Sequence, residues 1–143
     1  MAVLNLEDQL VFYRSYHYNT VNVLIHSVFV PTILFASIGL CNNVRVLGVP
    51  LGILGSIGYA VFYLLLEKKA GLLSVPILLG VSVKTNDWLI ASDYGFNNVL
   101  IALFVTGWII QFVGHGVFEK RAPALLDNLV QALFLAPFFV LFE

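Results

Sequence analysis

The sequence is 143 residues long, which favours one domain, but 60% of its residues are hydrophobic and only 10% are charged. A water-soluble domain carries about 25% charged residues, so this composition excludes a fully solvated surface and predicts that lipid covers much of the protein. The net charge of −1, with seven scattered Lys and Arg residues, excludes a nucleic-acid-binding surface, and the single cysteine excludes an internal disulfide and a cysteine-based zinc site.

The N-terminal residues are acidic and lack the positive segment of a cleavable signal peptide, so we expect the first apolar span to act as the membrane signal. Residues 5–18 are predicted to form a short amphipathic helix at the membrane surface. Its apolar side carries, at helical spacing, Leu6, Leu10, Tyr13 and His17. Its polar side carries Glu7, Asp8, Arg14 and Ser15. An ordinary solvated first helix is the alternative. Asn19 and Thr20 then predict a break and a helix N-cap.

Five apolar stretches follow, at residues 21–40, 46–66, 70–83, 97–118 and 128–142. Three of them are long enough to cross a hydrocarbon core of about 30 Å, whereas the third is short and the last is broken by Pro137. The longest polar connection is residues 84–96, where Trp88 and Tyr94 are typical of the headgroup layer. We therefore expect an all-α fold: a single domain over residues 1–143, built as a polytopic membrane helical bundle with four or five transmembrane helices.

Basic residues set the expected orientation of this bundle. If all five stretches cross the membrane, one face collects Arg14, Lys68, Lys69, Lys120 and Arg121. The other face collects only Arg45 and Lys84. The positive-inside rule then predicts that the richer face, with the N-terminus, is cytosolic.

All three histidines fall near this cytosolic face. His17 ends the surface helix, His26 lies about 8 Å into the first span at a rise of 1.5 Å per residue, and His115 precedes the end of the fourth span by about one turn. Ionisable residues within a span are costly and indicate function. Imidazoles bind zinc, iron, copper and nickel, and three of them with open positions make a reactive site. This convergence requires that residues 70–83 cross the bilayer, since otherwise His115 would lie on the opposite face.

Three polar neighbours accompany the histidines. Glu119 follows His115 by four residues and is a candidate fourth ligand, acceptor for an imidazole N–H, or catalytic base. Asn22 and Gln111 precede His26 and His115 by four residues each and are predicted to orient them. The alternatives are that the histidines only join neighbouring helices by hydrogen bonds, and that the segment from Glu119 to Arg121 is a solvated loop.

Two motifs then resemble a known family. The first is Tyr16-His17 followed by Asn22, His26 and Pro31, and the second runs from Gln111 to Leu125. Together they resemble the small membrane family of iron(II)-dependent 2-hydroxy fatty acid dioxygenases, and the likeness covers nearly the whole chain. The family acts in fatty acid α-oxidation, including phytosphingosine breakdown at the endoplasmic reticulum.

The resemblance implies a metal, two substrates and a location. His17, His26 and His115 would hold iron(II), and a 2-hydroxy long-chain fatty acid would react with dioxygen to give the acid one carbon shorter and carbon dioxide. Lys120 or Arg121 would steer the substrate carboxylate, with the site toward the cytosolic face of the endoplasmic reticulum if the chain is eukaryotic. Two other classes stay open: a zinc-dependent membrane hydrolase or hydratase with Glu119 as base, and a non-enzymatic membrane scaffold or carrier.

Overall fold

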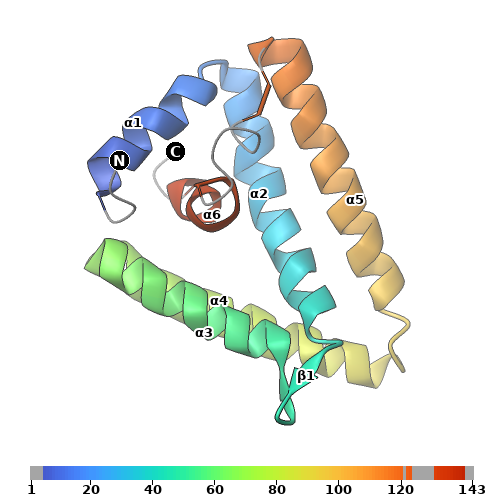
Figure 1. Cartoon of the computed structure of the whole chain (residues 1–143). Helices are drawn as coiled ribbons and strands as arrows, with labels where there is room; N and C mark the ends of the chain where they lie inside the picture. The colour runs from blue at the N-terminus through green and yellow to red at the C-terminus, as the bar shows by residue number, and fades with distance from the viewer. Residues whose placement is uncertain (1–4, 121, 124–130, 141–143) are drawn as a thin grey trace. The chain divides into compact units, whose positions relative to one another are not determined.

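The computed structural model of the chain describes residues 5–120, 122–123 and 131–140. These residues are almost entirely helical, which confirms the predicted all-α class apart from one small hairpin (Figure 1). The elements in chain order are α1 (Leu6–Tyr16), α2 (Thr20–Cys41), β1 (Arg45–Val46), β2 (Val49–Pro50), α3 (Leu51–Leu66), α4 (Lys68–Ala91), α5 (Asn97–Val113), the π-helices η1 (Gly114–Glu119) and η3 (Gln131–Leu135), and α6 (Ala136–Phe139).

The chain forms two compact units. The first unit combines residues 1–32 with residues 106–143, and the second comprises residues 33–105, so the dividing points lie within α2 and α5. All three histidines belong to the first unit. The expected single catalytic domain stays a prediction.

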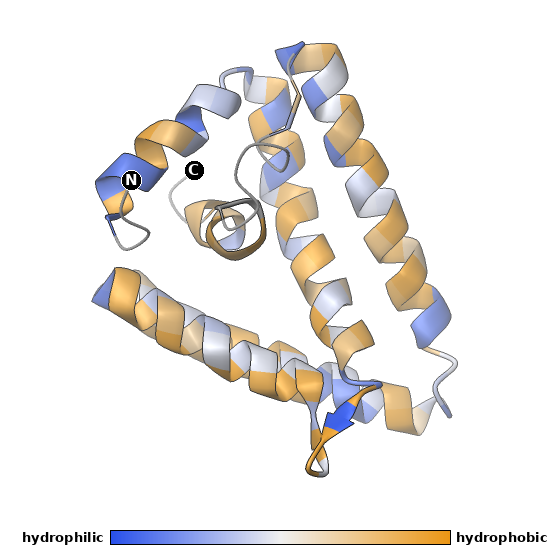
Figure 2. Cartoon of the chain, viewed as in Figure 1, coloured by the Kyte–Doolittle hydropathy of each residue, from blue (hydrophilic) through white to orange (hydrophobic). Residues whose placement is uncertain are grey.

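Two helices of the described residues are long and apolar enough to cross a membrane. They are Thr20–Cys41, with a mean hydropathy of 2.1, and Asn97–Glu119, with a mean hydropathy of 1.8. The helix α3 is also strongly apolar but has only 16 residues (Figure 2). The expected four or five transmembrane helices therefore stay a prediction. Part of the last predicted stretch, 128–142, lies outside the described residues.

In the first unit, α1 forms the helical part of the predicted segment 5–18, and its amphipathic character at a membrane surface stays a prediction. Its N-cap is Asn5, whose side chain accepts a hydrogen bond from the Asp8 amide, and the helix ends just before His17. The charged residues Glu7, Asp8 and Arg14 are exposed, whereas Leu6 and Leu10 of the predicted apolar side are only partly buried. The buried side is lined by Gln9, Tyr13 and Tyr16. The predicted break before α2 is also present, because Asn19 Oδ1 accepts from the Val21 amide at 2.9 Å and caps that helix.

In the second unit, α2 is followed by a hairpin at a place where a membrane span was predicted. The strands β1 and β2 pair antiparallel, with Val46 opposite Val49. Leu47 and Gly48 join them, both with positive φ, as a two-residue hairpin turn requires. The span predicted for residues 46–66 is therefore wrong at its start, and α3 begins only at Leu51.

The polar connection predicted for residues 84–96 is also largely helical. α4 runs without interruption from Lys68 to Ala91, so only residues 92–96 connect it to α5. The reason is a buried stripe at helical spacing that continues past Lys84: Gly71, Ser74, Leu78, Ser82, Thr85 and Leu89. Whether residues 70–83 cross a bilayer stays a prediction.

A glutamate caps the start of α4. Glu67 lies between α3 and α4, and its carboxylate accepts hydrogen bonds from the amides of Lys69 at 3.1 Å and Ala70 at 2.6 Å. These amide bonds hold the pKa of the Glu67 carboxyl below its usual value. Gly71 allows the start of α4 to lie close to the end of α3, since a side chain at this position would collide with the backbone of Leu64.

Candidate metal centre

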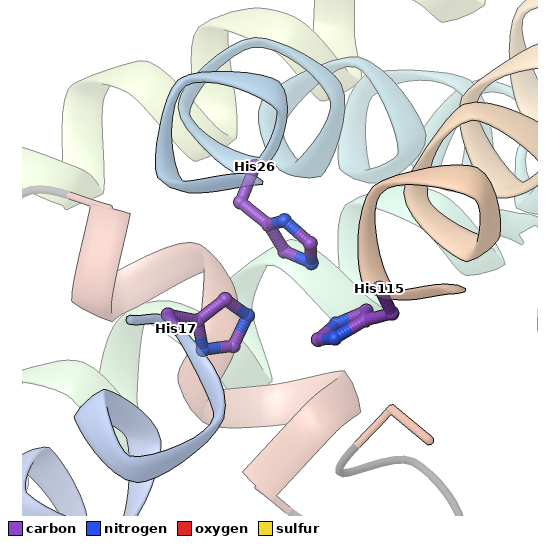
Figure 3. A group of neighbouring side chains, drawn as sticks. All are labelled: His17, His26 and His115. Carbon is purple, nitrogen blue, oxygen red and sulfur yellow. The ribbon is translucent and has the colours of Figure 1, made fainter. Parts of the chain in front are cut away.

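The three histidines converge within the first unit, as the sequence analysis predicted. His17 is the C-cap of α1, His26 lies in the second turn of α2, and His115 is the second residue of η1. Their ring centroids lie 4.4 Å apart for His17 and His26, 4.8 Å for His26 and His115, and 5.2 Å for His17 and His115. The three rings point toward one another from three separate segments (Figure 3).

Backbone carbonyls fix two of the rings. His17 Nδ1 lies 2.9 Å from the carbonyl oxygen of Tyr13, and His26 Nδ1 lies 2.9 Å from that of Asn22. A carbonyl oxygen can only accept, so Nδ1 carries the proton in both rings and the lone pair is on Nε2. Histidines that bind metals commonly donate their other ring N–H in this way. Both rings are thereby held in the tautomer that a metal needs.

Two imidazole nitrogens lack a partner. His17 Nε2 and His115 Nδ1 are both buried, and neither has a hydrogen-bond partner within the described residues. A buried polar atom left in this state costs about 1–3 kcal/mol. One nitrogen from each of the three rings lies within 4.8 Å of the others, which is close enough for the three rings to bind one metal ion. The donor set therefore fits a metal ion.

The charge state of His17 also suits a metal ligand. Burial and, to a smaller extent, the neighbouring His26 together lower the pKa of His17 to about 3, although the hydrogen bond to the Tyr13 carbonyl opposes the shift. The ring is therefore neutral at physiological pH and binds a metal without first losing a proton.

A tyrosine covers one face of the His17 ring. Tyr13 stacks on it with centroids 4.0 Å apart and ring planes 22° from parallel. Phe139 of α6 packs against Tyr13 in turn, at a centroid distance of 4.9 Å, and is fully buried. Tyr13 therefore covers one face of the His17 ring, and Phe139 supports Tyr13 from α6.

The π-helix η1 presents His115. It spans Gly114–Glu119, and the amide of Lys120 donates to the carbonyl of His115 across its last turn. π-helices are rare and are often found at functional sites. The apolar stretch at residues 97–118 predicted one regular helix and did not indicate this change. The signal available was the pair of glycines, Gly114 and Gly116, that flank the histidine.

Glu119 lies beside the start of α2. Its Oε1 atom accepts hydrogen bonds from the amides of Tyr18 and Asn19, each at 2.8 Å, and from Asn22 Nδ2 at 3.1 Å. The potential metal-binding group in the described part of the chain consists of the three histidines without Glu119. These contacts span about 100 positions of sequence, so spacing alone did not reveal them. A catalytic role for Glu119 stays a prediction.

The other predicted site residues lie as follows. Asn22 does hold His26, but through its backbone carbonyl rather than its side chain. Gln111 is buried, its Nε2 has no partner within the described residues, and its contact with His115 stays a prediction. Lys120 is exposed and adopts a left-handed backbone conformation. Arg121 lies outside the described residues.

Gly114 permits the close approach of η1 to α2. A Cβ atom there would collide with Asn22 Oδ1 and meet Ile25 Cδ1 at 3.3 Å. Gly114→Ala should therefore push His115 away from His26 and lower the free energy of unfolding by about 1–3 kcal/mol. The displaced ring should weaken Co(II) binding by about tenfold or more. Titration of the metal-free protein, followed by Co(II) absorption, measures this.

Gly116→Ala is the matched control for Gly114→Ala. It also flanks His115, but a Cβ atom at Gly116 meets nothing within 4 Å among the described residues. We expect its Co(II) affinity to equal that of the wild type. Equal affinities for the two alanine variants would contradict the role assigned to Gly114.

Comparison with known proteins places this centre in a family. Residues 3–143 match the family described as 2-hydroxy-palmitic acid dioxygenase Mpo1-like. The chain is 49% identical over 143 residues to the 2-hydroxy-palmitic acid dioxygenase MPO1 of Saccharomyces cerevisiae, covering 99% of this chain and 80% of that protein. No solved structure matches the chain. The chain, with its three convergent histidines, therefore belongs to the Mpo1-like family.

Proposed function

We propose that this chain is an iron(II)-dependent dioxygenase that cleaves 2-hydroxy long-chain fatty acids to the acid one carbon shorter and carbon dioxide. The observation that carries the proposal is the cluster of His17, His26 and His115, whose ring nitrogens lie within 4.8 Å of one another. The substrate class follows from the name of the yeast relative, a 2-hydroxy-palmitic acid dioxygenase.

The chain's own residues support this chemistry. His17, His26 and His115 would hold the ion as neutral donors and leave coordination positions open, since the three rings supply only three ligands. When bound, iron(II) supplies dioxygen activation and an anchoring point for the carboxylate and hydroxyl of the substrate. Lys120, exposed at the end of η1, and the following Arg121 would attract the substrate carboxylate.

The bilayer is the proposed source of the substrate. The helices Thr20–Cys41 and Asn97–Glu119 are both apolar enough to span a membrane, and each carries one histidine of the cluster. A long acyl chain dissolves in the same layer, where each CH₂ group removed from water contributes about 0.8 kcal/mol. We place the metal centre toward the cytosolic face of the endoplasmic reticulum in a eukaryotic cell, as the distribution of basic residues predicts.

Product analysis tests the proposal. Purified protein, iron(II), dioxygen and 2-hydroxypalmitic acid should yield the acid one carbon shorter and carbon dioxide, with one dioxygen consumed for each acid cleaved. Mass spectrometry of the acids and an oxygen electrode give both quantities. Equal turnover under argon with zinc alone would overturn the proposal and favour a zinc-dependent hydrolase.

A further inference from the structure

The carboxylate of Glu119 contacts the chain at the junction of α1 and α2. Three donors converge on its Oε1 atom: the amides of Tyr18 and Asn19 at 2.8 Å each and the side-chain amide of Asn22 at 3.1 Å. Hydrogen bonds to a charged acceptor are roughly twice as strong as those between neutral groups. This oxygen therefore ties η1 firmly to the start of α2.

Each partner of Glu119 adjoins a histidine of the cluster. Tyr18 and Asn19 directly follow His17 in the break after α1. Asn22 lies one turn before His26, and its carbonyl accepts from the ring of that histidine. Glu119 itself ends η1, the π-helix that carries His115. A single carboxylate thus links the three segments that supply the three rings.

At the start of α2, Glu119 takes the place of the glutamate of a capping box, although it lies far away in the sequence. In a capping box, the residue three positions after the N-cap is Glu or Gln, and its side chain reaches back to the N-cap amide. Asn19 is the N-cap of α2, and the residue three positions later is Asn22. Asn22 instead donates to Glu119, which accepts from the Asn19 amide in its place. The start of α2 is therefore completed by the segment that carries His115.

We propose that Glu119 is a positioning residue, whose carboxylate fixes the distances between His17, His26 and His115 so that they bind one metal ion. This inference rests on the proposed metal centre, but it does not depend on which reaction the metal performs. A positioning role for Glu119 can be distinguished from the roles of catalytic base and metal ligand. A positioning role needs an acceptor oxygen, which Gln also has, whereas a base or an ionic ligand needs the negative charge.

Metal affinity distinguishes these roles. The metal-free protein, purified in detergent, is titrated with Co(II) and followed by its visible absorption. Glu119→Ala should weaken Co(II) binding by about 10–100-fold, the usual cost of losing a residue that orients metal ligands. Glu119→Gln should restore most of this loss. An affinity of Glu119→Gln as low as that of Glu119→Ala, or wild-type affinity in Glu119→Ala, would overturn the proposal.

Glu67 provides a matched control. Its carboxylate also accepts two backbone amides at the start of a helix, those of Lys69 and Ala70, but this helix carries no histidine. Glu67→Ala should therefore cost stability in the second unit and leave the Co(II) affinity within about threefold of wild type, the range of a change below about 0.7 kcal/mol. An equal loss of Co(II) affinity in Glu67→Ala and Glu119→Ala would show a general effect of losing a helix cap and would refute the assignment.

Amide hydrogen exchange supplies a readout that needs neither metal nor turnover. The amides of Tyr18 and Asn19 should be protected in the wild type and in Glu119→Gln, and should exchange faster in Glu119→Ala. Unchanged protection of both amides in Glu119→Ala would contradict the proposed link. A protein that shows these exchange and Co(II) effects but does not cleave a 2-hydroxy acid would disprove the proposed function and leave the role of Glu119 intact.

Discussion

Replacing His17, His26 or His115 by alanine should abolish cleavage of 2-hydroxy acids and lower the metal content of the purified protein. A site of three rings keeps only two ligands after any one replacement. The loss should exceed the roughly 100-fold upper range for residues that merely orient ligands. Metal analysis of anaerobically purified variants, paired with the rate of dioxygen uptake, measures both effects.

Tyr18→Ala is the control for the histidine replacements. Tyr18 directly follows His17, its side chain is 91% exposed, and its backbone amide survives the substitution. We expect near-normal metal content and activity in this variant. Full activity with normal metal content in His26→Ala would remove His26 from the site, and the same result for either other histidine would remove that residue.

Cleavage should require dioxygen and iron(II) but neither 2-oxoglutarate nor a flavin. Oxidation of a 2-hydroxy acid to the shorter acid and carbon dioxide releases four electrons, three from the hydroxyl-bearing carbon and one from the carboxyl carbon. One dioxygen molecule accepts four electrons, and its two oxygen atoms balance the shorter acid, carbon dioxide and one water. The substrate is therefore its own reductant, and ascorbate would serve only to keep iron ferrous.

The measurement is a turnover assay with and without 2-oxoglutarate. The rate should stay the same when 2-oxoglutarate is omitted, and no succinate should form when it is present. Ascorbate should extend the duration of activity without changing the ratio of dioxygen consumed to acid cleaved. A strict requirement for 2-oxoglutarate, or succinate formed in proportion to product, would overturn this mechanism.

The convergence of the histidines could be predicted from the sequence because each lies near an end of a recognisable helix. His17 and His26 flank a recognisable helix break, and His115 lies near the end of an apolar helix. The contacts of Glu119 could not be predicted, because its partners lie about 100 positions away and involve backbone amides, which every residue except proline has. Nor does helical periodicity distinguish a π-turn from an α-turn, so η1 was missed.

The start of α3 and the end of α4 were predicted wrongly for physical reasons. Hydropathy averages over residues, so it cannot separate the apolar hairpin at residues 45–50 from the apolar helix that follows. In α4, the polar residues Lys84 and Asp87 indicated a connection, although the buried stripe continued through Thr85 and Leu89. The spacing of buried residues over these two further turns, rather than the polarity of single residues, therefore indicates where α4 ends.

The first unit is assembled from the two ends of the sequence, and this has a consequence for the order of folding. Asn22 and Glu119 are 97 residues apart, so joining their segments closes a loop whose entropy costs about 4 kcal/mol plus a constant. The hairpin of α3 and α4 closes over a single intervening residue and can form while synthesis continues. The metal centre cannot form until His115 has emerged from the ribosome. A bound ion would therefore stabilise only chains whose early and late segments have met, and nascent chains would pass through a stage with a helical hairpin but no metal site.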